Sequence, residues 1–247
     1  MNLQKRTKHE QCYWCMTYDS LYGQILPFPQ PVTFGQPALT DVLCQKSADA
    51  GAIGVVLAEL GQVDMPIVWV QDYAARRENG QLYAPGLRSM QITQPILRVT
   101  VSHPRDVLWS MEEAATCAGL TAVIGEVHGA PAALDFTATK RLTMRAEASG
   151  VPLYLIRSGD PGVLSAARAR WRVVSLPSQP NPHDAQAPGQ AQWDLDLFRA
   201  RGRNPGRWVA RYDPQASRAA DRLSLVPRSD LRTLETGDQR LPDSAKP

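Results

Sequence analysis

Apolar and polar positions in the first half of the chain switch between two regular spacings. From Ile53 to Leu60, apolar residues recur at i, i+3, i+4 and i+7, which is the spacing of a helix with one buried face, and Gly61 follows as a stop. The next apolar run, Pro66–Val70, is short and continuous, as in the buried strands of parallel sheets. This segment therefore predicts a helix followed by a buried strand.

The same two patterns repeat as far as residue 176. Further helices are predicted over Tyr83–Met90, from Pro104 to Gly119 and, with Asp135 or Thr137 as the N-cap, as far as Gly150. Further strands are predicted over Ile96–Val101, Thr121–Val127, Val151–Arg157 and Ala169–Leu176. Strands that alternate with helices are typical of a parallel sheet covered by helices. The pattern predicts an α/β core over residues 36–176.

The pattern changes after residue 176. Residues 177–191 are rich in Pro, Gln and Ala and predict a linker. Two segments that alternate with a period of two, Trp193–Phe198 and Trp208–Tyr212, flank a glycine-containing turn, so residues 192–227 predict a β-hairpin with one apolar and aromatic face. Residues 1–35 are predicted to form an N-terminal arm, and residues 228–247 a disordered tail.

Composition supports a globular, cytoplasmic protein. The chain has 247 residues, of which 43% are hydrophobic, enough for one well-packed core. It lacks an apolar run of the roughly 18 residues that cross a membrane, and its basic N-terminus has no apolar segment of the secretory kind behind it. Cys12 and Cys15 form a CxxC pair without further ligands, so we interpret them as ordinary cysteines and predict no metal.

Positive charge is concentrated in the C-terminal third. The chain carries +3 overall, but twelve arginines and six aspartates between Leu164 and Arg232 give that stretch +6. Arginine binds phosphate and carboxylate groups through paired donors, so the stretch is suited to nucleic acid or to an acidic protein surface. An exposed face kept soluble by its charge is the alternative. The candidate contacts, in the hairpin and on the helix after Val127, are Trp193, Phe198, Arg199, Arg201, Arg203, Arg207, Trp208, Arg141 and Arg145.

A nucleotide site is not predicted. A phosphate-binding loop needs glycines whose backbone curls round the phosphates, followed by a lysine and a hydroxyl residue. Lys46 and Ser47 precede the first helix, but Gln45 stands in place of the glycine before the lysine, and Thr40 in place of the first glycine. Glu126 is interpreted as a polar residue at the end of a strand. Since no catalytic set is visible either, we predict neither a cofactor nor an enzymatic activity.

Several segments resemble the ImuA family. They are PRDVLWSMEEAA (Pro104–Ala115), TAVIGEV (Thr121–Val127), TATKRLTMRAEASG (Thr137–Gly150), RWRV (Arg170–Val173) and WDLDLFRARGRNPGRW (Trp193–Trp208). Members of this family are RecA-like accessory proteins of the bacterial SOS mutagenesis cassette. The resemblance extends over roughly residues 60–227 and implies a RecA-like sheet for the predicted core.

The resemblance also implies a function and partners. It implies a non-enzymatic factor of error-prone translesion DNA synthesis that acts with ImuB and, through ImuB, with a second polymerase of the DnaE type. RecA and DNA are further candidate partners, and no membrane is expected. A DNA-binding or ATP-dependent regulator of recombination remains the alternative. The C-terminal hairpin is the expected docking element, because aromatic and arginine residues are typical anchors of interfaces.

Overall fold

A computed structural model describes residues 37–60, 65–184, 186–216 and 222–228. The predicted arm over residues 1–35, with its CxxC pair, and the predicted tail after Arg228 lie outside these residues. None of the helices in the described ranges has the length and apolar character needed to cross a membrane.

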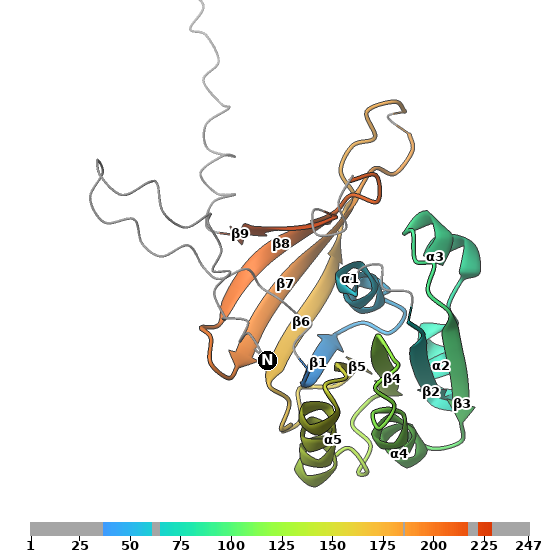
Figure 1. Ribbon diagram of the computed structural model, residues 1–247. Helices are drawn as coiled ribbons and strands as arrows, with labels where there is room; N and C mark the ends of the chain where they lie inside the picture. Colours follow the sequence, from blue (N-terminus) through green and yellow to red (C-terminus); the bar gives the residue numbers. More distant parts are fainter. Residues whose placement is uncertain (1–36, 61–64, 185, 217–221, 229–247) are drawn as a thin grey trace, which may run out of the picture. The chain divides into compact units, whose positions relative to one another are not determined.

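The described chain is built round one nine-stranded sheet (Figure 1). Its strands are β1 (Leu39–Cys44), β2 (Ile67–Asp72), β3 (Ile96–Val101), β4 (Ala122–His128), β5 (Leu153–Ser158), β6 (Ala169–Leu176), β7 (Ala191–Ala200), β8 (Gly206–Tyr212) and β9 (Leu223–Pro227). The strand order is β3-β2-β4-β5-β1-β6-β7-β8-β9. Neighbours from β3 to β6 run parallel, and β7, β8 and β9 are added antiparallel to this edge.

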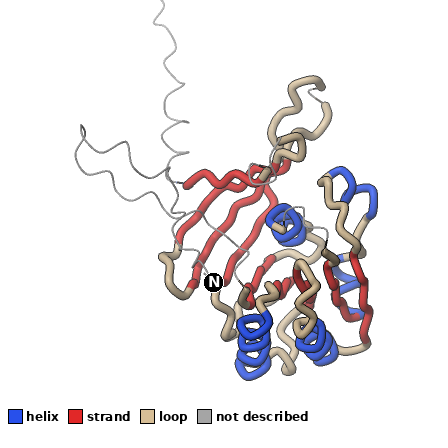
Figure 2. The backbone as a smooth tube through the Cα atoms, in the orientation of Figure 1, coloured by secondary structure: helices blue, strands red, loops and turns tan. Residues whose placement is uncertain are grey.

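Helices cover both faces of the parallel half (Figures 1 and 2). They are α1 (Gly51–Glu59), α2 (Tyr73–Asn79), α3 (Ala84–Ser89), α4 (Pro104–Ala114) and α5 (Phe136–Ser149). The apolar faces of α4 and α5 pack with Leu39, Val123 and Leu153 in one buried cluster. Helix α1 lies on the opposite face, where Trp193 of β7 contacts it.

Local sequence signals explain where the principal helices begin and end. The Asp135 carboxylate accepts a hydrogen bond from the Ala138 N–H at 2.7 Å, which caps α5, and Gly150 ends this helix with a left-handed φ of 79°. Asp72 caps α2 in the same way, through the Ala75 N–H at 2.6 Å. The short α2 was not predicted, because its sequence YAARREN has a single buried position, Ala75.

The predicted α/β architecture is confirmed, with additions at both ends. The expected helices and strands are present, and β1, α2 and β9 are added to them. The predicted hairpin forms as β7 and β8, but it continues the main sheet, because β7 pairs with β6 from Gln192 to Ala200. Residues 177–184 and 186–190 therefore lie between two neighbouring strands of the same sheet, and do not separate two domains.

Candidate functional site

The loop between β1 and α1 occupies the place where nucleotide-binding α/β proteins hold phosphate, at the carboxyl end of a strand and before a helix. Our expectation that Thr40 takes the place of the first loop glycine is wrong. Thr40 lies inside β1, paired with Tyr154 and Ala169 of the neighbouring strands. The loop comprises residues 45–50, so Lys46 and Ser47 are exposed at its start and not at the first turn of α1.

A side chain of the protein itself occupies the positive end of α1. The Asp49 Oδ1 atom accepts a hydrogen bond from the Gly51 N–H at 2.8 Å and another from the Ser175 hydroxyl at 2.5 Å. Its Oδ2 atom accepts one from the Ser175 N–H at 3.2 Å. Burial opposes ionisation of Asp49, but these hydrogen bonds outweigh it and hold its pKa below the usual range. A carboxylate therefore stands where phosphate oxygens would be bound.

The first turn of α1 has no residues that could replace a nucleotide loop. It begins Gly51-Ala52, where phosphate-binding proteins have a lysine and a hydroxyl. The turn is also covered, since a Cβ atom added to Gly51 would lie 3.1 Å from the Trp193 ring. A Cβ atom on Gly54, one turn further, would lie 2.7 Å from the same ring. The Asp49 charge and the packing of Trp193 therefore both exclude a phosphate group from the start of α1.

Glu126 lies inside β4 and is fully buried, so the interpretation of a strand-end residue is wrong. Its Oε1 atom accepts hydrogen bonds from Trp69 Nε1 at 2.5 Å and from Gln71 Nε2 at 2.9 Å. Its Oε2 atom accepts one from Asn79 Nδ2 at 3.1 Å. Burial raises the pKa of Glu126, although the three donors oppose this shift. The carboxyl group joins β2, α2 and β4 and is not open to a ligand.

The raised pKa of Glu126 predicts a pH dependence of stability. The folded chain keeps this proton to higher pH than the unfolded chain does, so the unfolded state binds fewer protons. Stability therefore falls as the pH rises from the ordinary carboxyl value of 4.5 through the raised value. Glu126→Gln should remove this decline, because a carboxamide does not titrate. Asn79 Oδ1, which has no partner among the described residues, is suited to accept from the new amide.

Urea denaturation at a series of pH values measures this effect. Glu113→Gln, at an exposed position of α4, is the matched control and should leave the pH profile as in the wild type. A profile that stays equally steep in the Glu126→Gln variant would show that another group is responsible.

Four charged side chains form a buried cluster across β1, β5 and β6, which we call the ion quartet: Asp41, Arg157, Asp160 and Arg170. Asp41 Oδ2 accepts hydrogen bonds from Arg157 at 2.7 Å and from Arg170 at 3.1 Å. Asp160 Oδ2 accepts one from Arg157 Nε at 2.7 Å. Burial lowers the pKa of Arg170, and the charge of Asp41 opposes that shift. The two positive and two negative charges balance.

The ion quartet also fixes the loop after β5. Asp160 Oδ1 accepts hydrogen bonds from the N–H groups of Gly162 and Val163, at 2.6 and 2.9 Å. Arg170 donates to the carbonyl oxygen of Val163 at 2.8 Å. The ion quartet was not predicted, and its one signal in the sequence is an aspartate inside the run LTDVLC.

The aromatic candidates of the hairpin point into the protein. Trp193 is 6% exposed, so our expectation that it contacts a partner is wrong for the chain in this conformation. Trp208 is half-buried, with its ring 5.8 Å from that of Trp171. Phe198 is half-buried as well, with the Arg172 guanidinium 4.0 Å from its ring centroid. These rings stabilise the extended sheet.

Some of the predicted arginine contacts form ion pairs with described residues, and others do not. Arg207 forms an ion pair with Asp194 at 3.0 Å, and Arg141 forms one with Glu112 of α4 at 2.8 Å. Arg203 is half-buried in the β7–β8 turn, and Arg145 is exposed on α5. Their contacts with a partner or with DNA stay predictions.

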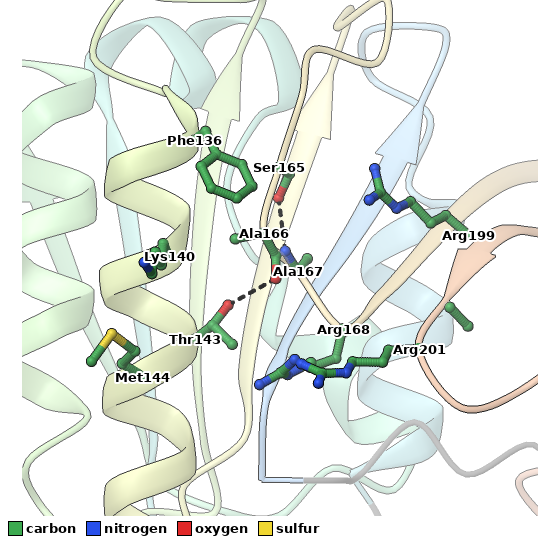
Figure 3. Close-up of a pocket in the computed structure, with 11 residues that line it drawn as sticks. Phe136, Lys140, Thr143, Met144, Ser165, Ala166, Ala167, Arg168, Arg199 and Arg201 are labelled. Atoms are coloured by element: carbon green, nitrogen blue, oxygen red, sulfur yellow. Dashed lines mark hydrogen bonds between the residues drawn. The ribbon is translucent and has the colours of Figure 1, made fainter.

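Arg199 and Arg201 are exposed and line a cavity of about 520 Å³ beside α5 (Figure 3). Lys140, Phe136 and Met144 come to the same cavity from α5. The structure thus brings two of the predicted arginines to a helix about sixty residues earlier in the chain. Phe136 and Met144 were not predicted, although both interrupt the polar face of the helix sequence.

This architecture defines a RecA-like α/β protein: a mostly parallel sheet flanked by helices and extended at one edge by antiparallel strands. The crystal structure of the RadB recombinase matches it with a TM-score of 0.51 and covers 74% of this chain and 90% of its own. The two sequences are 14% identical, so this likeness concerns the fold alone.

Sequence comparison finds relatives over part of the chain. Protein ImuA from two strains of Caulobacter vibrioides, NA1000 / CB15N and ATCC 19089 / CIP 103742 / CB 15, is 32% identical to the chain over 154 residues. The match covers 58% of this chain and 59% of each relative, less than two thirds of their length. No family model matches. Over the matched segment the chain is similar to these ImuA proteins, in agreement with the resemblance seen in the sequence.

Proposed function

We propose that this protein is a non-enzymatic, cytoplasmic accessory factor of error-prone translesion DNA synthesis. In this proposal it acts with ImuB and, through ImuB, with a second polymerase of the DnaE type. Support comes from the ImuA relatives and the RecA-like fold. The observation that carries the non-enzymatic part is the Asp49 carboxylate at the positive end of α1, where a nucleotide-dependent relative would bind phosphate.

The closed loop argues against the alternative of an ATP-dependent recombination regulator. A triphosphate would have to displace the Asp49 carboxylate, which already accepts three hydrogen bonds. If the carboxylate stayed in place, its negative charge would lie within contact distance of the phosphate and repel it. No lysine of α1 would compensate. The fold therefore serves as a scaffold in this proposal, and its surfaces carry the function.

We expect isothermal titration calorimetry of the full chain with Mg-ATP to show no binding tighter than about 1 mM. We also expect ImuB to co-purify with the full chain to the same extent with and without Mg-ATP, because no nucleotide state controls the scaffold. Micromolar ATP binding, or a complex with ImuB that needs ATP, would favour the regulator of recombination. Absence of ImuB in both conditions would overturn the adaptor function.

Deletion of residues 193–247 is not a suitable test of docking. It would remove β7, β8 and β9 from the main sheet and expose the face of α1 that Trp193 covers. If the deletion variant failed to bind ImuB, the cause could be unfolding of the sheet or loss of an interface, and the experiment would not distinguish them. Substitutions of exposed side chains avoid this problem.

A further inference from the structure

One cavity of the molecule combines unpaired positive charge with exposed apolar side chains. We call it the basic pocket and define it by Phe136, Lys140, Met144, Arg168, Arg199 and Arg201 (Figure 3). Its volume is about 520 Å³, and Ala166, Ala167 and Ala200 also line it. It lies between α5, the segment leading into β6 and the end of β7.

Charge in the basic pocket is not balanced. None of its described lining residues is acidic, and only Arg168 has an ion-pair partner, Glu147 of α5. No described residue forms an ion pair with Lys140, Arg199 or Arg201. Arg168 and Arg201 both line the pocket and are joined by a backbone hydrogen bond, so two like charges share one wall. An anionic ligand would relieve this repulsion.

Apolar surface accompanies this charge. The Phe136 and Met144 side chains are 45% and 59% exposed, and the alanines of the lining add further apolar area. The segment before the lining is apolar and exposed as well, at Val163 and Leu164. An apolar centre with a charged rim is the usual anatomy of a protein interface.

The pocket walls are held firmly in place. The Thr143 hydroxyl of α5 donates to the Ala166 carbonyl oxygen at 3.2 Å, and the Ala166 N–H donates to Thr139 at 3.0 Å. On the other side, the Arg201 N–H donates to the Arg168 carbonyl oxygen at 2.8 Å. A partner would therefore meet a preformed site with little ordering cost.

We propose that the basic pocket binds an acidic segment of a partner protein that packs one apolar side chain against Phe136, beside Lys140 (Figure 3). This inference rests on the proposed function, for which it supplies a docking site. A protein segment fits better than a nucleic-acid strand for two reasons. Phe136 is the only aromatic among the described lining residues, whereas strands bind along successive aromatic rings. The neighbouring Arg141 forms an ion pair with Glu112, which interrupts the positive charge of α5 between Lys140 and Arg145.

Fluorescence anisotropy with the full chain tests this proposal. The probe is a labelled glutamate-rich peptide with one central phenylalanine, compared with the same peptide carrying serine there and with labelled oligothymidylate. The double variant Arg199→Glu/Arg201→Glu should weaken binding of the phenylalanine peptide by on the order of tenfold or more. The matched control Arg88→Glu/Arg98→Glu changes two exposed arginines of α3 and β3 and should alter affinity by less than about twofold.

The outcomes separate this proposal from its alternatives. Tighter binding of oligothymidylate than of the peptide would assign the pocket to nucleic acid and overturn the proposal. Equal affinity of the peptide for the wild type and for the Arg199→Glu/Arg201→Glu variant, equal affinity of the two peptides, or no peptide binding would overturn it as well. Co-purification of ImuB is scored separately. If ImuB binds the wild type and this variant equally, the adaptor function stands and the pocket is not its docking site.

Discussion

Replacing Arg157 with methionine is expected to lower the free energy of unfolding by about 3–5 kcal/mol, the usual cost of removing one partner from a buried ion pair. The substitution leaves Asp41 and Asp160 buried with Arg170 as their single cation, so the ion quartet keeps an uncompensated negative charge. Chemical denaturation followed by tryptophan fluorescence measures the loss. A loss below about 1 kcal/mol would mean that water reaches the cluster or that the neighbouring groups rearrange.

A double variant distinguishes charge from packing. Asp41→Leu combined with Arg157→Met leaves Asp160 and Arg170 as a balanced pair, so it should be less destabilised than Arg157→Met alone. Asp41 Oδ1 has no partner among the described residues, which reduces what this carboxylate contributes. Arg105→Met is the control. Arg105 is 80% exposed beside Asp106, and its removal should cost about 0–1 kcal/mol.

The alternation of helices and strands could be predicted because local periodicity carries it. The runs PIVWV and TAVIGEV are buried and mostly apolar, with Glu126 as the charged exception, and helix α4 between them keeps one apolar stripe. Asp135 and Gly150 mark the limits of α5 in the sequence as they do in the structure. Elements whose apolar pattern is continuous or periodic in the sequence can be predicted without tertiary information.

The missed elements depend on contacts between distant residues. Strand β1 carries Asp41 in its centre, and a carboxylate inside a buried strand breaks the apolar pattern. Its partner Arg157 is 116 positions away, so only the assembled sheet shows why the charge is tolerated. The expectation for Thr40 was wrong for the same reason, because the positions of a phosphate-binding loop were aligned with residues that form strand β1.

Only the residue types of the candidate site could be predicted from the sequence, not their arrangement. The arginines of the hairpin were predicted as candidate contacts, but the sequence does not show which of them are paired. Asp194 neutralises Arg207 across two strands, while Arg199 and Arg201 meet Lys140 of α5. Aromatic alternation likewise predicted strand β7 and one apolar face, but not the helix that covers this face.

Replacing Trp193 with alanine is expected to cost about 3–5 kcal/mol, as in other buried tryptophan truncations, although the sequence suggested a surface anchor. The Trp193 ring lies against Gly51 and Gly54 of α1, so closely that a Cβ atom on Gly54 would be 2.7 Å from it. Its removal leaves a cavity between α1 and β7 that the helix backbone is poorly placed to fill. Strand β7 would then lose this contact with α1.

Trp109→Ala is the matched control for this experiment. Trp109 is 61% exposed on α4, so its truncation should change the free energy of unfolding by less than about 0.5 kcal/mol. Denaturation midpoints by far-ultraviolet circular dichroism allow both tryptophans to be compared without relying on their fluorescence. A stable Trp193→Ala variant that loses a protein partner would instead show that Trp193 leaves the α1 contact to bind. Because the ring fills the space above both α1 glycines, we expect the loss of stability and not this release.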